Sequence, residues 1–207
     1  MLLFNNFTIL GFVFTLSAIL IGFTVHEFTH AYVANKLGDD TSKLMGRLSL
    51  NPFAHLDLFG TLFLIIAGFG WGKPVMVNSR NFKNPIADNV IVSLSGPMSN
   101  LALAGIAGLF LRFIPSMPEL LQTFLVLLVF FNLVLMIFNF LPIPPLDGSK
   151  LLSLFLPEEA YAFLEQFGIY ILLGLIIFSS TFPVIPFVIS NVVGFFFQLI
   201  TGQQIAI

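Results

Sequence analysis

The stretch "LGFVFTLSAILIGFTVHEFTH", residues 10–30, decides how this chain folds. Residues 10–25 are apolar or small and carry no charge, which is typical of a segment that enters a membrane. A His-Glu-x-x-His pattern at residues 26–30 stands at the end of this run. Ionisable side chains beside a membrane-entering segment are costly, so they are functional candidates by default.

The composition extends this interpretation to the whole chain. Of its 207 residues, 57% are hydrophobic and only 9% are charged, and the mean hydropathy is +1.01. A soluble domain carries about 25% charged residues, so this chain lacks the polar surface of a soluble protein. No basic stripe suggests a nucleic-acid partner. The absence of cysteine excludes a disulfide framework and thiolate chemistry.

Hydropathy and helix breakers divide the chain into segments. We expect a first helix over residues 7–37, ending at Gly38 as a helix C-cap and retained, because no basic region precedes it as in a signal peptide. Residues 58–69 form an apolar run too short for an easy span, which is typical of a re-entrant segment. Further spans are expected over residues 90–113 and 120–141. A segment that carries Glu158, Glu159 and Glu165 has the pattern of an interfacial helix, and residues 169–200 form one kinked helix or a hairpin.

The predicted fold is therefore an all-α polytopic membrane protein. It is a helical bundle with a re-entrant or loop segment near the active site. We expect one integral membrane domain over residues 1–207, with a core at residues 7–156 and C-terminal membrane segments at residues 168–201.

The distribution of basic residues predicts the orientation. If the N-terminus is outside and residues 58–69 do not cross, only Arg112 faces outward. The other seven of the eight basic residues then face the cytoplasm, as the positive-inside tendency predicts: Lys36, Lys43, Arg47, Lys73, Arg80, Lys83 and Lys150. We therefore expect a multi-pass protein of the cell membrane, with the active site toward the cytoplasmic side.

The His-Glu-x-x-His pattern predicts a zinc site. His26 and His30 are four residues apart, so on a helix they share one face and can hold one zinc ion. Glu27 lies beside the first ligand, within reach of a zinc-bound water whose pKa the metal lowers toward about 7. The alternative is a chance arrangement of two helix histidines and a glutamate that faces water.

A catalytic zinc site usually has three protein ligands and a water, so a third ligand is needed. Asp147, in "NFLPIPPLDGSK" (residues 139–150), follows prolines that forbid regular helix, and non-helical backbone at membrane depth lines protein or a cavity. Its alternative role is the N-cap of a segment that starts at Gly148. His55, in "NPFAHLD" (residues 51–57), is the other candidate, since three histidines are a known catalytic set. Its alternative is an interfacial histidine beside Asp57.

Three motifs carry a family resemblance. "HEFTH" (residues 26–30), "SGPMSN" (residues 95–100) and "NFLPIPPLDGSK" follow one another in a small polytopic chain, which resembles the site-2 proteases. These zinc metalloproteases cut transmembrane or membrane-proximal peptide bonds, and this chain looks like a compact prokaryotic branch without a PDZ domain.

The resemblance implies roles for particular residues. It implies one zinc ion held by His26, His30 and Asp147, with Glu27 as the general base. It also implies that Asn139 holds the substrate backbone, and it raises a substrate or oxyanion role for Asn100. The implied partners are membrane protein substrates in a lipid bilayer, with no nucleic acid.

Two alternatives remain open. Asn132, in the third span, is either helix–helix glue or a functional amide. The whole chain could instead be a zinc-binding membrane transporter or ion-handling protein. Such proteins often contain internal repeats, whereas the ionisable residues here match a hydrolytic set.

Overall fold

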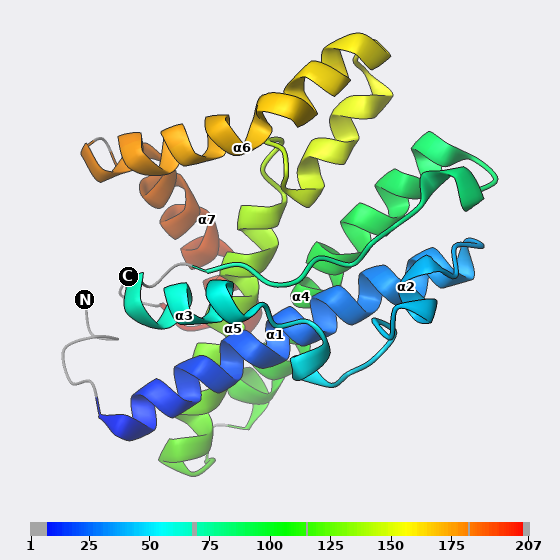
Figure 1. Cartoon of the computed structure of the whole chain (residues 1–207). Coiled ribbons are helices and arrows are strands. Elements are labelled where there is room, and N and C mark those ends of the chain that lie inside the picture. Colours follow the sequence, from blue (N-terminus) through cyan, green and yellow to red (C-terminus); the bar gives the residue numbers. More distant parts are fainter. Residues whose placement is uncertain (1–7, 68–69, 115, 182, 205–207) are drawn as a thin grey trace.

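The computed structural model describes residues 8–67, 70–114, 116–181 and 183–204, and over this part the fold is helical (Figure 1). Its extended pairing there is a single antiparallel bridge between Leu56 and Gly72. The elements, in chain order, are α1 (Ile9–Lys36), α2 (Thr41–Leu44), η1 (Pro52–Ala54), α3 (Leu58–Ala67), η2 (Ser79–Asn81), α4 (Pro85–Phe113), α5 (Glu119–Asn139), η3 (Asp147–Leu154), α6 (Glu158–Thr181) and α7 (Val184–Thr201).

Helices α1, α4 and α5 form the centre of the molecule, each packed against the other two, and α7 covers α4 and α5. Small buried residues such as Gly96, Ala104 and Ala107 line the packed side of α4. Lipid tails provide no hydrophobic drive for helix association, so close approach of backbones over small side chains holds such bundles together.

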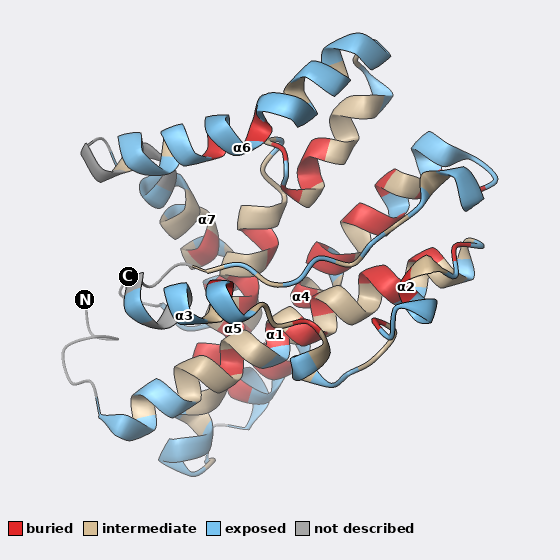
Figure 2. Cartoon of the chain, in the orientation of Figure 1, coloured by how far each residue is buried: buried red, intermediate tan, exposed pale blue. Residues whose placement is uncertain are grey.

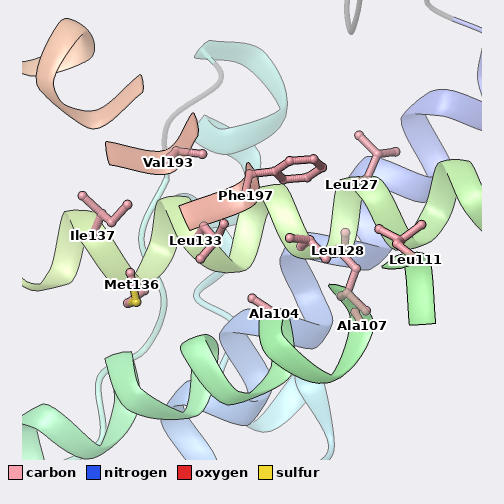
Figure 3. Close-up of a cluster of buried hydrophobic side chains, with 12 residues drawn as sticks. Ala104, Ala107, Leu111, Leu127, Leu128, Leu133, Met136, Ile137, Val193 and Phe197 are labelled. Atoms are coloured by element: carbon pink, nitrogen blue, oxygen red, sulfur yellow. The ribbon is translucent and has the colours of Figure 1, made fainter. Parts of the chain in front are cut away.

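The apolar core lies where α4, α5 and α7 meet (Figure 3). Leu133 and Val129 of α5 and Val193 of α7 are completely buried in it. Many other large apolar side chains face outward, and the outer helices are mostly exposed (Figure 2). That distribution is expected where lipid, rather than water, covers the surface.

The first three predicted spans are confirmed, and they correspond to α1, α4 and α5. Among the described residues, four helical stretches are long and apolar enough to cross a membrane: Ile9–Lys36, Pro85–Phe113, Glu119–Asn139 and Glu158–Ser179. Residues 1–7 lie outside the described part, and α1 stops before Gly38, whose φ of 109° only glycine adopts readily. The protein is therefore a multi-pass, all-α membrane protein.

The segment around α3 forms a hairpin along the bundle. Leu56 and Gly72, on either side of α3, form the antiparallel bridge, and Lys73 N donates to His55 O at 2.8 Å. The ten residues of α3 extend about 15 Å, half the thickness of a hydrocarbon core. The chain thus leaves this segment beside the point where it arrived, as expected of a re-entrant element. Residues 68 and 69 of the predicted segment lie outside the described part.

The C-terminal part differs from one expectation. The separate interfacial helix predicted around Glu158, Glu159 and Glu165 is instead the first part of the continuous helix α6. The expected start at residue 168 therefore falls inside α6. Of the two arrangements left open for residues 169–200, the structure has two helices, α6 and α7, in contact with each other. A polar first turn followed by a long apolar run lets one helix serve both parts.

The predicted break after the third span is present. Helix α5 ends at Asn139, and the chain turns through residues 140–146 before η3 begins at Asp147. Gly148 lies against the end of α5, because a Cβ there would stand 2.5 Å from the carbonyl carbon of Phe140. The close approach, which only glycine allows, brings the start of η3 back to the bundle.

Candidate metal centre

Three side chains that can ligate a metal converge between α1 and η3. His26 and His30 lie one turn apart on α1 and are 5% and 7% exposed. Asp147 is the first residue of η3. Their potential ligand atoms all lie within 4.8 Å of one another. The helix period therefore joins the two histidines, and the turn after α5 supplies the carboxylate.

The separations of these atoms suit a tetrahedral zinc ion. Nε2 of His26 lies 2.9 Å from Nε2 of His30, and Oδ2 of Asp147 lies 3.1 Å from the first and 3.3 Å from the second. Ligand atoms at about 2.0–2.1 Å from a tetrahedral zinc stand about 3.3 Å apart. Two imidazole nitrogens and a carboxylate oxygen are also the donor types that zinc takes.

Hydrogen bonds on the far side of each ring fix the tautomers. Nδ1–H of His26 donates to Oδ1 of Asn100 at 2.7 Å, and Nδ1–H of His30 donates to the Val92 carbonyl at 2.8 Å. Because both partners are acceptors, each neutral ring presents a bare Nε2 lone pair to the centre. Oδ2 of Asp147 is buried and has no hydrogen-bond donor among the described residues. Three acceptor atoms that face one another in this way need a cation between them, so the residues fit zinc.

Glu27 lies beside this centre, partly exposed to the same cavity. Its Oε2 accepts a hydrogen bond from Val75 N at 3.3 Å. Val75 belongs to residues 74–77, which form no helix and run as an extended stretch between α3 and α4 (Figure 1). A hydrogen bond from Ser42 Oγ to Met76 O at 2.7 Å also holds this stretch. The carboxylate is therefore held at the cavity wall, beside the three converging side chains.

Gly96 allows α4 to pass directly against the two histidine rings. A Cβ at this position would stand 2.6 Å from Cε1 of His30 and 2.7 Å from Cε1 of His26. The glycine of the "SGPMSN" motif thus provides room for the rings, and its asparagine, Asn100, orients one of them.

A cavity of about 820 Å³ opens over the centre. Its walls come from α1, the extended stretch, the first turns of α4, the end of α5, η3 and α6. Among its lining residues are His26, Glu27, His30, Val75, Met76, Asn89, Ser93, Asn139, Asp147, Lys150, Tyr161 and Glu165. The polar ends of several elements thus surround one space, large enough for a peptide segment.

A charged pair closes the rim between η3 and α6. Nζ of Lys150 contacts Oε1 of Glu165 at 2.5 Å, and Tyr161 OH donates to the same oxygen at 3.0 Å. Burial by itself lowers the pKa of Lys150, but the hydrogen bond and charge of Glu165 outweigh burial and raise that pKa above its usual value. Lys150 is therefore charged at neutral pH and ties α6 to the element that carries Asp147.

The two contenders for the third position lie in different places. His55 is fully buried in the loop before α3, where Nε2–H donates to Ser49 O at 2.8 Å. Asp57 does not pair with it and instead accepts a hydrogen bond from Gly60 N at 2.8 Å. Asp147 does not act as a helix cap, because Leu146 holds that position without a side-chain bond. The structure therefore brings Asp147, and not His55, to the histidine pair.

The two asparagines of the motifs differ in their surroundings. Asn139 lines the cavity, and its Nδ2 donates to Leu135 O at 3.0 Å. Asn100 is fully buried behind His26 and is not among the cavity's lining residues. Its surroundings favour a role toward His26 over contact with a substrate.

Several contributors to the site went unrecognised in the sequence. The extended stretch at residues 74–77 and the Lys150–Glu165 pair have no local signature, since both depend on long-range packing. The buried amide of Asn100 carries a signal, because a polar group in an apolar helix needs a partner. That requirement alone does not say which partner it has.

Comparison with known proteins agrees with this geometry. The family model "Peptidase family M50" matches residues 114–179. Three relatives are named "Putative zinc metalloprotease": YwhC of Bacillus subtilis, Rip2 of Mycobacterium tuberculosis (strain Erdman) and MJ0611 of Methanocaldococcus jannaschii. YwhC is 44% identical over 79% of this chain and 77% of its own length.

Rip2 is 32% identical over 91% of this chain and 72% of its own length, and MJ0611 is 33% identical over 72% and 74%. No solved structure matches the chain. The identity and coverage of these relatives, together with a donor set that fits zinc, assign the chain to peptidase family M50, the site-2 protease family of zinc metalloproteases.

Proposed function

We propose that this protein is a zinc-dependent intramembrane endopeptidase that cuts peptide bonds in or near transmembrane segments of other proteins. One observation carries the proposal. His26, His30 and Asp147 converge beside Glu27 in a cavity lined by polar and apolar side chains, among helices that are apolar enough to cross a membrane. A hydrolytic centre in such surroundings suits a substrate that is itself embedded in lipid.

His26, His30 and Asp147 would hold the zinc ion. When bound, zinc acts as a Lewis acid and lowers the pKa of water toward about 7. Glu27 is the proposed general base, which removes a proton from the attacking water and later delivers it to the leaving amine. The hydrogen bond from Val75 N to Oε2 of Glu27 orients this carboxylate at the cavity wall.

A helical substrate must be unwound before its backbone can be cut, because its own hydrogen bonds protect it. The groups it frees then need partners. Residues 74–77 line the cavity as an extended stretch (Figure 1), and the side chain of Asn139 lines another part of it. Both support the proposal that an unwound segment is held in this cavity as an extended chain.

Access to water fits a site at one end of the bundle. The centre lies in the C-terminal half of α1, beside the break after α5, and its cavity reaches the first turns of α4. We propose that this end faces the cytoplasm and the N-terminus lies outside, since seven of the eight basic residues then face inward.

The test is Glu27→Gln, assayed by co-expression with a panel of single-span membrane proteins and by cleavage in reconstituted vesicles. The variant keeps the shape of the side chain but loses the base, so cleavage should fall at least about 100-fold. Zinc content should stay near that of the wild type, because Glu27 is not in the ligand set.

The matched control is Glu119→Gln. Glu119 is an exposed glutamate in the first turn of α5, remote in the fold from the end of that helix where Asn139 lies. It should cleave like the wild type. Undiminished cleavage by Glu27→Gln would show that Glu27 is not the general base and would refute the proposed mechanism.

A further inference from the structure

A series of hydrogen bonds between buried amides connects all three central helices and ends at His26. It runs from Asn132 on α5 through Asn100 on α4 to the histidine on α1. Both asparagines are completely buried. Neither asparagine lines the cavity, so the role of these hydrogen-bonded amides lies within the bundle.

The direction of each hydrogen bond in this series is determined. Nδ2 of Asn132 donates to Leu128 O at 2.8 Å, which leaves its Oδ1 to accept from Nδ2 of Asn100 at 2.9 Å. Nδ2 of Asn100 also donates to Gly22 O at 3.0 Å. Oδ1 of Asn100 is thereby aimed at His26, where it accepts from Nδ1–H at 2.7 Å.

Asn132 is held closely against α1. A Cβ on Gly22 would stand 2.8 Å from Oδ1 of Asn132, so the two backbones approach over a glycine. An amide confined in this way on three sides has one orientation available to it.

From this geometry we infer that Asn132 is a positioning residue for the metal centre, acting through Asn100 on His26. Its Oδ1 is one of two acceptors that keep Nδ2 of Asn100 away from the histidine ring. If Asn100 turned over, its NH₂ group would face Nδ1 of His26 and favour the tautomer whose Nε2 carries the proton. Such a ring offers no lone pair to zinc.

The inference rests on the proposed ligand set of His26, His30 and Asp147. It differs from a role as helix–helix glue, because glue predicts loss of stability without a specific effect on the metal. Partners behind a ligating histidine typically contribute 10–100-fold to metal affinity.

The main test variant is Asn132→Leu, which keeps the approximate volume and removes the amide. Zinc retention against a chelator should fall about 10-fold, and the visible spectrum of the cobalt-substituted protein should change as His26 reorients. Asn132→Ala is the second variant, for use if the branched side chain disturbs the contact with Gly22.

The matched control is Leu133→Ala, the next residue on the same helix and equally buried, but packed among apolar side chains (Figure 3). It should lower the thermal unfolding temperature while leaving zinc retention and the cobalt spectrum unchanged. Equal zinc loss in this control and the Asn132 variants would reduce Asn132 to general packing and overturn the inference.

Coupling provides the second measurement. If Asn132 acts through Asn100, the double variant of Asn132→Leu and Asn100→Ala should retain as much zinc as Asn100→Ala alone. Multiplying effects, or wild-type retention in the Asn132 variants, would overturn the inference. Asp147→Ala tests the proposed ligand set separately from the inference on Asn132. Full zinc retention in that variant would show that Asp147 is not a ligand and would contradict the ligand set itself.

Discussion

Replacing Gly96 with alanine adds one methyl group directly against the two histidine rings of the metal centre. Helix propensity alone favours the change by about 1 kcal/mol, since glycine is a poor residue inside a helix. The structure predicts the opposite outcome for the site. The new Cβ would stand 2.6 Å from Cε1 of His30 and 2.7 Å from Cε1 of His26.

The magnitude follows from that overlap. Carbon atoms attract one another at about 3.5–4.0 Å, so the rings or α4 must move by about 1 Å. The rings cannot retreat freely, because Nδ1–H of His26 is bonded to Asn100 and Nδ1–H of His30 to Val92. A displacement of about 1 Å in a catalytic constellation can cost about 100-fold in rate. We expect that loss of cleavage, with zinc retention lowered about 10-fold or more.

Gly105→Ala is the matched control on the same helix, because a Cβ there meets no atom of the described residues within 4 Å. It should bind zinc and cleave like the wild type, with unchanged or slightly higher thermal stability. Zinc content after gel filtration with a chelator, cleavage of one single-span substrate and thermal unfolding in detergent are measured for all three proteins. If Gly96→Ala matches Gly105→Ala in zinc and cleavage, the close approach of α4 to the histidines is not what positions them.

Three further predictions concern the ligands, the substrate and the orientation. Asp147→Ala should lose most of its zinc and all cleavage, whereas His55→Ala should keep its zinc, since His55 is bonded to Ser49 O away from the centre. Elemental analysis of the purified variants measures the zinc content, and the reverse pattern would make His55 the third ligand. Asn139→Ala should raise the substrate concentration needed for half-maximal cleavage while zinc and folding stay intact, and metal loss would make Asn139 structural. A reporter fused after Lys83 should be cytoplasmic and one fused after Ile114 external; an external signal after Lys83 would mean that residues 58–69 cross the membrane.

The sequence alone was sufficient for features that depend on neighbours along the chain. Apolar runs of sufficient length predicted the spans, and the prolines at residues 142, 144 and 145 predicted the break after α5. The four-residue spacing placed His26 and His30 on one face of a helix, because the helix period is a local property. Local rules were less reliable where a polar turn ran into an apolar helix, as in α6.

The third metal-ligating position was beyond such rules. Asp147 and His55 both offered a suitable donor near a membrane helix, and the motif resemblance, not the spacing, favoured Asp147. The fold brings Asp147 to the histidine pair because Gly148 lets the start of η3 return against the end of α5.

Only the tertiary structure decided how the site is supported. Asn100 orients His26, Gly96 makes room for both rings, and Val75 bonds to Glu27, although these residues lie far from α1 along the chain. Which distant groups meet depends on how the small-residue faces of α1 and α4 fit against each other and against the larger side chains of α5, to within fractions of an ångström. Hydropathy and helix period describe each segment by itself, and so they determine the parts of this protein but not the contacts between them.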